Sequence, residues 1–503
     1  MAHSAMPVLV GVGQLTSRWE ADRPADKAPS PKSLCIQAAR LALTDAGIGI
    51  DEIDTVAVVR IFEDSVPGGA HPHGHNSNLA GTIVRDLGAK PAHTLYAGVG
   101  GHSPQQLANE MAARIAAGET DCALITGAEA NRASKAANKR GISLNWQDAS
   151  DRDIEDRGLG EMLLSRSEIK HGIVLPAYFY SLIENAMAAK LGQTRTDRRV
   201  YMSDLFARFA AVAAGHPQAQ FDTSTFTPDF LATPSRQNYP FADPFLKWHI
   251  AQDAVNQGAA LIMMSDAKAD RLGIPEAKRV YLHGGGEASD DFLSERPNLS
   301  GSWAMHAALQ RALSQANKTP ADIDVFDLYS CFPCAVFSAL DALGIDHSQE
   351  MRALTVTGGL PFFGGPGNNY SMHALVSMAE TLRRKAGAFG LVLANGGWLT
   401  KEAVGIWSTQ RPDDFIPVEA AAKPVETVPI EVEPAAGVIE TYTITYDKNG
   451  PQSGIVFART KEAKRFIAQA TPSAMPRLLA EDSPVGLPIT VVSENQRNRF
   501  TFA

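Results

Sequence analysis

The chain has 503 residues, of which 45% are hydrophobic and 20% are charged, and its formal net charge is -9. This composition is typical of a folded globular protein and excludes disorder over most of the length, while the length itself predicts about three domains. The negative charge argues against a protein built around nucleic acid, and the lack of a run of ~18 apolar residues argues against a membrane-spanning helix or a membrane partner.

The start of the chain, MAHSAMPVLVGVGQL, contains a short apolar run that reads as a first β-strand. No basic stretch precedes this run and no small-residue cleavage site follows it, so we expect a cytoplasmic protein. The cysteines are too few for a disulfide scaffold in so long a chain and are expected to be thiols; they are Cys35, Cys122, Cys331 and Cys334.

One supersecondary unit occurs twice. Ala42 to Asp54 aligns without a gap with Ala312 to Asp324, and in both copies an apolar-periodic helix leads into a strand. A second pair, Asp121 to Gly127 and Phe389 to Gly396, follows in the same order. Helices that alternate with short apolar strands predict buried, largely parallel sheets, so we expect an α/β protein of two halves that pack on each other with helices between them.

The rest of the chain divides by composition. We assign 1–128 and 239–276 to the N-terminal half, 129–238 to an inserted loop domain, 277–410 to the C-terminal half, 411–436 to a Pro-rich linker and 437–503 to a β-rich tail. The linker composition favours an extended chain, and its reach would not restrict where the tail docks.

The tail reads as five strands with one short helix after the third. The expected strands are 439–446, 454–460, 465–470, 489–492 and 499–502, and the expected helix is 475–480. This is the layout of an OB-like all-β barrel, a fold that often binds nucleic acid, but the near balance of charges in the tail makes a nucleic-acid partner unlikely. Its apolar residues exceed what so small a barrel can bury, so we expect the tail to pack on the body.

Four segments carry a resemblance to a known family. They are Val99 to Leu107 (VGGHSPQQL), Asp327 to Phe332 (DLYSCF), Gly358 to Pro366 (GGLPFFGGP) and Ala394 to Gly396 (ANG). With the repeat and the inserted domain, they make residues 5 to 408 resemble the thiolase superfamily, nearest its sterol-carrier-type thiolase-like members. The resemblance implies a duplicated thiolase fold of two βαβαβ halves in layers, and coenzyme A, as acyl-CoA, for a ligand or substrate.

The departures from the family pattern bear on mechanism. A thiolase has a nucleophilic Cys, an activating His and a second acid/base Cys, and the matching positions here are Gly100, Gly365 and Ala394. Glycine and alanine can neither attack a thioester nor move a proton, so acyl transfer through an acyl-cysteine at residue 100 is excluded on this alignment. The peptide N–H groups of Gly100 and Gly396 keep the family's oxyanion hole, which would stabilise the enolate of an acyl-CoA in aldol-type C–C chemistry.

Such chemistry needs a proton carrier. His373 is our first choice, because an unperturbed histidine has a pKa near ~6.5, and Tyr329 and Tyr370 are the further candidates. Asn368, Asn369 and Cys331 are expected to contact substrate. The run His71-Pro-His-Gly-His75 suggests a metal, but without acidic or cysteine companions we expect a solvated loop and no metal site.

Three functions remain open. The first is an enzyme of lipid metabolism that acts on acyl-CoA thioesters as an aldolase-type lyase. The second is a non-catalytic acyl-CoA-binding or scaffold protein, and the third, by family membership alone, is an acetyl-CoA acetyltransferase. The family default is a homodimer, although a tail that covers the same surface in cis would give a monomer.

Overall fold

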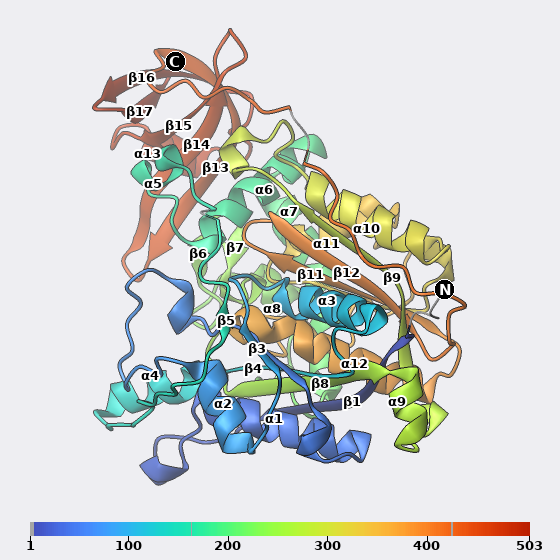
Figure 1. Ribbon diagram of the computed structural model, residues 1–503. Helices are drawn as coiled ribbons and strands as arrows, with labels where there is room; N and C mark the ends of the chain where they lie inside the picture. Colours follow the sequence, from blue (N-terminus) through green and yellow to red (C-terminus); the bar gives the residue numbers. More distant parts are fainter. Residues whose placement is uncertain (1–4, 162, 424–425) are drawn as a thin grey trace.

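A computed structural model describes residues 5–161, 163–423 and 426–503 (Figure 1). Within these residues the strands form a ten-stranded sheet, in the order β10-β11-β12-β9-β1-β8-β4-β2-β3-β5, and a seven-stranded sheet that includes the tail. No helix of the described chain is long and apolar enough to span a membrane.

The N-terminal half begins with a strand and a capped helix. Ser30 accepts a hydrogen bond from the Ser33 N–H, Pro31 occupies the first helical position, and Gly47 ends the helix in a left-handed conformation. The elements of this half are β1 (Pro7–Thr16), α1 (Pro31–Ala46), β2 (Thr55–Val58), α2 (Leu79–Leu87), β3 (His93–Tyr96), α3 (Ser103–Ala117), β4 (Cys122–Glu129), β8 (Gln257–Ser265) and α9 (Asp266–Arg271).

The C-terminal half repeats this order with one exception. Its elements are β9 (Val280–Ser289), α10 (Trp303–Gln315), β10 (Val325–Leu328), α11 (Pro333–Leu343), α12 (Tyr370–Arg384), β11 (Phe389–Gly396) and β12 (Lys401–Ser408). The described residues between α11 and α12 form no strand that corresponds to β3. Strands β1 and β9 join the halves, with Val8 opposite Tyr281 and Leu9 opposite Val280. The duplicated α/β architecture expected from the internal repeat is confirmed.

The helices lie in layers about the strands. In Figure 1, α3 and α12 lie between the strands of the two halves, with α1 and α2 outside the first set and α10 and α11 outside the second. Both central helices contact strands of both halves and each other. The helical layer expected between the halves is therefore present, and the start of α3 lies deep inside the molecule.

The sheets are less parallel than the sequence suggests. Strand β2 pairs in parallel with β3 and β4, and β10 with β11, but β8 runs antiparallel to both β1 and β4, and β12 runs antiparallel to β11 and β9. The reason is connectivity. Only four residues separate β11 from β12, which permits a hairpin but no crossover helix.

The inserted segment is mainly helical, with α4 (Asn131–Arg140), α5 (Arg166–Lys170), α6 (Pro176–Lys190), α7 (Arg195–Gly215) and α8 (Pro228–Ala232). Its short strand β5 (Glu155–Asp156) pairs in parallel with the outer edge of β3. Residues 240–246, which we expected to continue the N-terminal half, instead form β6 (Pro240–Ala242) and β7 (Phe245–Leu246), which extend the sheet of the tail.

The tail closes into a ring of five strands. The elements are β13 (Ala436–Asp447), β14 (Gly450–Arg459), β15 (Arg465–Ala470), α13 (Met475–Ala480), β16 (Pro488–Glu494) and β17 (Arg497–Phe502). Their order is β14-β15-β17-β16-β13, and β13 pairs back onto β14. Each of the five expected strands is present, four of them a few residues longer than expected, and the helix has the expected bounds.

Side chains on the tail strands point alternately into the tail and toward the body of the protein, and those on the second face form the contact with the body. Phe457 and Ile467 belong to the hydrophobic core of the body, whereas Phe466 and Leu478 pack inside the tail. Successive side chains of a strand point to opposite faces, so one face of β14 and β15 fills the barrel and the other covers the body. The apolar residues that the tail was not expected to bury alone include Phe457 and Ile467, and these two pack on the body.

One buried ion pair lies at the same contact. The Arg465 guanidinium is fully buried, donates to Glu440 Oε2 at 2.7 Å and donates to the carbonyl oxygens of Ser294 and Arg296 at 3.0 and 2.6 Å. The segment expected as a linker also follows the body, because the Ala421 N–H donates to the Glu287 carbonyl at 2.8 Å.

Candidate functional site

The loop before α3 meets the end of β11. A Cβ atom on Gly396 would lie 3.3 Å from the Cα of Gly100, so the two backbones are in contact. Gly100 has a φ of 145°, in the range that favours glycine. The structure thus brings together the two glycines that the sequence assigns to an oxyanion hole.

The side chain of His102 fills the space between these glycines. A Cβ atom added to either Gly100 or Gly396 would collide with the His102 Nδ1 atom. Burial first, and Lys401 second, lower the pKa of His102 to about 3, so the imidazole is neutral at physiological pH. Its Nδ1 atom is buried without a hydrogen-bond partner among the residues the structure describes. A neutral imidazole therefore lies between the two glycines.

A cavity of about 630 Å³ opens over this loop. Its walls come from four parts of the chain: the loop and start of α3 (Gly98, Val99, His102, Ser103), the strand ends at Ser289 and at Lys401 and Glu402, the inserted segment (Arg157, Gly160, Glu161) and the docked segment after β12 (Val418, Ala420). The inserted domain and the segment after β12 thus shape the same cavity as the glycine loop.

Glu402 is the second unusual group of this cavity. Its side chain is buried, and neither carboxylate oxygen has a hydrogen-bond partner within the described chain. Burial raises the pKa of Glu402 well above its usual value, an effect that Arg296 reduces and Asp290 reinforces. Glu402 is opposite Asn395 in the pairing of β11 with β12, one residue from Gly396. The site therefore holds a neutral imidazole beside a carboxyl group whose pKa is raised well above its usual value.

Two of the predicted site residues lie beside the glycine loop. The Tyr329 hydroxyl lies against Gly101, where a Cβ atom would collide with it. Cys331 Sγ lies 3.6 Å from Asn395 Nδ2. Burial raises the pKa of the Cys331 thiol to about 12 and the pKa of Tyr329 well above its usual value, so both remain protonated at neutral pH.

His373 has a different environment. It is buried on α12, its Nδ1 hydrogen-bonds to Gln14 Oε1 at 2.9 Å, and its ring packs on Phe363 with 5.2 Å between ring centres. Burial lowers its pKa to about 3. His373 is not among the described residues that line the cavity.

The polar residues before His373 make bonds within the protein. Asn368 Nδ2 donates to the Arg60 carbonyl at 2.9 Å, Asn369 Nδ2 donates to the Gly127 carbonyl at 2.7 Å, and the Tyr370 hydroxyl donates to Asp327 at 3.2 Å. These bonds tie the two halves and the second-half loops together. None of the three side chains is among the described lining residues of the cavity.

His102 and Glu402 were not assigned a role from the sequence. His102 stands two residues after Gly100 in the quoted loop, and that spacing was an available signal. Glu402 follows Lys401 at the start of a strand, where a charged pair reads as solvated, so its burial could be known only once the hairpin of β11 and β12 was placed.

The sequence and the structure of this chain are similar to those of thiolase-like proteins. Residues 416–496 match the family described as thiolase-like protein type 1 additional C-terminal domain. The whole chain is similar to the crystal structure of a monomeric SCP2-thiolase like protein type 1 from Mycobacterium smegmatis, with 36% identity, a TM-score of 0.84 and 100% of both chains covered.

Curated relatives match less of the chain. An acetyl-CoA acetyltransferase from Methanocaldococcus jannaschii is 21% identical over 320 residues, 63% of this chain and 72% of that protein. A probable acetyl-CoA acetyltransferase from Dictyostelium discoideum is 26% identical over 145 residues, 28% of this chain and 32% of that protein. The chain therefore spans about a third of the length of one of these relatives.

Proposed function

Because this chain belongs to the SCP2-thiolase-like protein type 1 family of the thiolase superfamily, we propose that it binds an acyl-CoA thioester and acts on it without an acyl-cysteine. The observation that supports the proposal is the position of His102, whose neutral imidazole lies against Gly100, the residue that the sequence aligns with the family nucleophile, beside a cavity of about 630 Å³. Buried polar atoms without partners are rare and are typical of functional sites.

The cavity suits the acyl and pantetheine part of such a ligand. Its volume lies within the range of ~300–1,000 Å³ that small-molecule sites occupy. Val99, Leu107 and Val418 give apolar wall, and Lys401 contributes positive charge at one side. Arg157 also lines the cavity, but its guanidinium forms a two-point ion pair with Glu110 at 2.7 and 2.8 Å, so we assign phosphate contact to Lys401 first.

The favoured reaction is retro-aldol cleavage of a β-hydroxyacyl thioester. His102 accepts the proton of the β-hydroxyl group only as the Cα–Cβ bond breaks, because a base with a pKa of about 3 cannot remove that proton beforehand; the products are a carbonyl compound and the enolate of a shorter acyl-CoA. For this step the imidazole, which lies between Gly100 and Gly396, has to turn toward the β-hydroxyl group. The peptide N–H groups of the two glycines then stabilise the enolate oxygen, and the protonated Glu402 carboxyl group delivers a proton to Cα. Charge and electrons balance without an oxidant or a further co-reactant, and in the other direction the same groups support an aldol addition.

A second candidate is a non-catalytic acyl-CoA-binding protein. The glycine and alanine at the three family positions favour it, because no side chain remains there for covalent chemistry. An acyltransferase mechanism has less support. The thiol beside the glycine loop is Cys331, and a pKa of about 12 keeps it from acting as a thiolate.

The test separates binding from turnover. Calorimetry with a series of acyl-CoA and β-hydroxyacyl-CoA esters should detect binding, and chromatography should detect a released carbonyl compound with a shorter acyl-CoA. His102→Ala and Glu402→Gln should each lower the rate by about 100-fold or more while binding persists. His306→Ala on α10 and Glu119→Gln after α3 are the matched controls, because both side chains are exposed and neither is among the described residues that line the cavity. Binding without cleavage supports the second candidate, and no binding at millimolar concentration contradicts both.

The tail completes the proposal. We assign it an OB-like fold, on the support of the closed strand order and the helix after the third strand. Its docking on the body and the cover that β5 gives to the edge of β3 support a monomeric protein. The tail then serves as a fixed part of the body and not as a separate nucleic-acid-binding module.

A further inference from the structure

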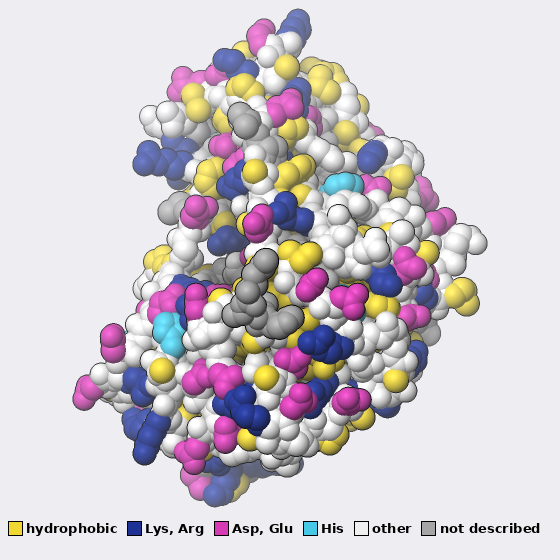
Figure 2. Space-filling view, turned by 45° about the vertical axis from the view of Figure 1, so that its right-hand side comes forward, with side chains coloured by type: hydrophobic (Ala, Val, Ile, Leu, Met, Phe, Trp, Pro, Cys, Tyr) yellow, Lys and Arg dark blue, Asp and Glu magenta, His cyan; other side chains and the backbone are white. Residues whose placement is uncertain are grey.

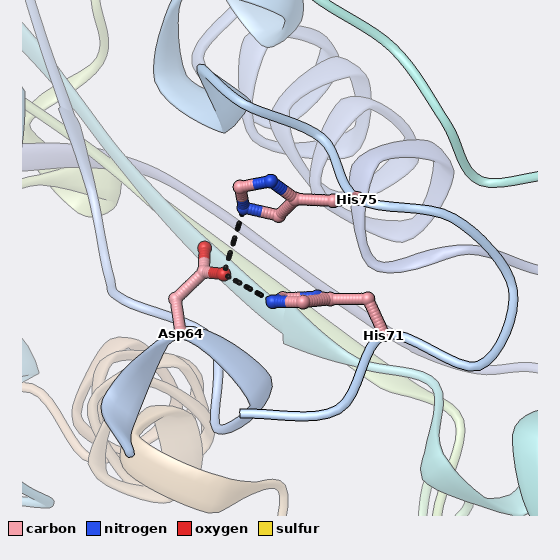
Figure 3. Close-up of side chains that lie close together, drawn as sticks. All are labelled: Asp64, His71 and His75. Carbon is pink, nitrogen blue, oxygen red and sulfur yellow. Dashed lines mark ion pairs between the residues drawn. The ribbon is translucent and has the colours of Figure 1, made fainter. Parts of the chain in front are cut away.

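Three side chains with metal-binding atoms converge at the surface between β2 and α2. Asp64, in a short 3-10 turn, and His71 and His75, in the following loop, point toward one another (Figure 3). Asp64 Oδ1 lies 3.7 Å from His71 Nε2 and 3.6 Å from His75 Nε2. One ligand atom from each residue lies within 4.8 Å of the others.

The loop has a backbone reason to bring the two histidines together. The Gly74 N–H donates to the His71 carbonyl at 3.1 Å, which closes a turn with Pro72 at its second position. Gly74 has a φ of 99°, and a Cβ atom there would lie 2.8 Å from the backbone of Gln147. The middle histidine, His73, turns away and is buried against Trp146, so the outer two share one side.

Neighbouring groups orient two of the three side chains. The Tyr96 hydroxyl donates to Asp64 Oδ2 at 2.6 Å, which leaves Oδ1 free to face the histidines. Glu63 Oε2 lies 3.5 Å from His71 Nδ1, on the far side of the ring from Nε2. A carboxylate at one ring nitrogen favours the proton there and a lone pair at the other, which is the outer-shell arrangement of histidine metal ligands.

The local charge also favours a cation. Glu63 and Asp64 are adjacent in the chain, and both carboxyl groups face the histidine pair. The two carboxylates are mostly covered, with side-chain exposures of 18% and 11%. A bound cation would compensate two negative charges held close together in a partly dry environment.

We propose that Asp64, His71 and His75 form a site for a divalent metal ion of the zinc class. Tetrahedral zinc with ligands at ~2.0–2.2 Å separates neighbouring ligand atoms by ~3.3–3.6 Å, and the two distances to Asp64 Oδ1 lie at the upper end of this range or just above it. His75 is 53% exposed, so the fourth position faces water. The sequence led us to expect no metal because acidic companions were missing, and Asp64 and Glu63 are those companions.

The site stands apart from the cavity of the proposed function. It fixes the loop between β2 and α2 to Tyr96 at the end of β3. Ser65, the next residue after Asp64, accepts a hydrogen bond from Asn368 Nδ2 at 2.9 Å, so this loop also contacts the C-terminal half. We therefore assign the ion a role in holding the loop between the two halves.

The test uses the full chain treated with a chelator and then titrated with zinc chloride. Calorimetry should show one zinc ion per chain, and cobalt chloride should give the visible absorption of a four- or five-coordinate site. Asp64→Asn and His75→Ala should abolish this binding, and Tyr96→Phe and Glu63→Gln should weaken it about 10-fold. His93→Ala is the matched control, because His93 is a half-buried histidine on β3 that pairs with Glu155 at 3.0 Å, as His71 and His75 pair with Asp64.

The outcomes are distinguishable from a folding defect. Circular dichroism and melting without metal should agree between the variants and the original chain, and zinc should raise the melting temperature of the original and of His93→Ala but not of Asp64→Asn. Zinc binding that survives in both Asp64→Asn and His75→Ala, or no one-to-one binding at up to millimolar zinc, would overturn the site.

Discussion

The Nδ1 atom of His102 occupies space that a Cβ atom on Gly100 would need. The glycine and the histidine are therefore one structural unit, because the absence of a side chain at position 100 is the condition for the imidazole to enter. Figure 2 shows one face of the molecule, with acidic, basic and apolar side chains interspersed over it. The polar groups of the proposed site, His102 beside the two glycines and Glu402, are instead buried.

The first prediction concerns a restored cysteine. Gly100→Cys should not give thiolysis of acetoacetyl-CoA, and it should lower the free energy of unfolding by roughly 2 kcal/mol or more, because the side chain meets His102 and the φ of 145° disfavours an L-residue. Urea denaturation and a thiolase assay measure the two effects.

Gly98→Ala is the control for this substitution, since a Cβ atom at Gly98 has nothing within 4 Å. It should change the stability by less than ~0.5 kcal/mol. A saturable thiolase activity in the unaltered protein would contradict the alignment of Gly100 with the family nucleophile.

The second prediction is a pH dependence from Glu402. Burial raises its folded pKa above the unfolded value of ~4.3, so its contribution to stability is complete below that pH and is lost as the pH rises toward the folded pKa. Glu402→Gln should match the original chain near pH 4 and be more stable at pH 7 to 8, by about 1.4 kcal/mol for each pH unit between the unfolded pKa and the lower of the folded pKa and the working pH.

Thermal and urea unfolding between pH 4 and 8 measure this difference. Glu161→Gln is the control, because Glu161 is an exposed residue of the same cavity whose carboxylate stays in water. A Glu402→Gln variant that is less stable than the original chain at every pH would contradict a neutral acid at this position.

The repeat carried most of the fold prediction. Ala42 to Asp54 and Ala312 to Asp324 are local patterns, and local patterns predict elements and their order well. The direction of β8 and β12 was missed, because strand direction depends on where the chain returns after a long insertion or a four-residue turn. The same limit hid the pairing of residues 240–246 with the tail, about 200 positions away.

The contact between the two glycines and the nearby Tyr329 and Cys331 follow the prediction, whereas the positions of His102 and Glu402 beside the cavity were not predicted. Gly100 and Gly396 are in contact as expected, since family loops fix the path of the main chain. His373 hydrogen-bonds to Gln14 on β1, a contact that no sequence spacing could reveal. Asp64 lies seven positions before His71, and only the folded loop brings the two within ligand distance.

The third prediction concerns the buried pair of the tail. Arg465→Ala should lower the free energy of unfolding by roughly 2–4 kcal/mol, because it leaves the buried Ser294 and Arg296 carbonyls without their donor, while Glu440 keeps its ion pair with Arg459 at 2.7 Å. Lys464→Ala removes an exposed pair with Glu431 next to it and should cost at most ~1 kcal/mol. Equal effects of the two substitutions in urea denaturation would contradict the anchoring role of Arg465.

The fourth prediction concerns assembly. Sedimentation of the whole chain should give a mass near 53.8 kDa, that of a monomer. Deleting residues 437–503 should cause association or loss of melting cooperativity, because it exposes the core surface that Phe457 and Ile467 cover. A truncated chain with unchanged mass and melting would contradict the docking of the tail as a structural requirement.

The contacts between α6 and β13 also set an order of events during synthesis. The Thr441 hydroxyl contacts the Leu182 carbonyl, and Asn185 Nδ2 donates to the Tyr442 carbonyl at 2.7 Å. Residues 182 and 185 are synthesised long before residues 441 and 442. While the chain is being made, the polar groups of α6 that bond to β13 therefore have no β13 to bond to. The middle of this protein can finish folding only after its end has been translated, and a prematurely terminated chain is left with an incomplete interior and not merely without a tail.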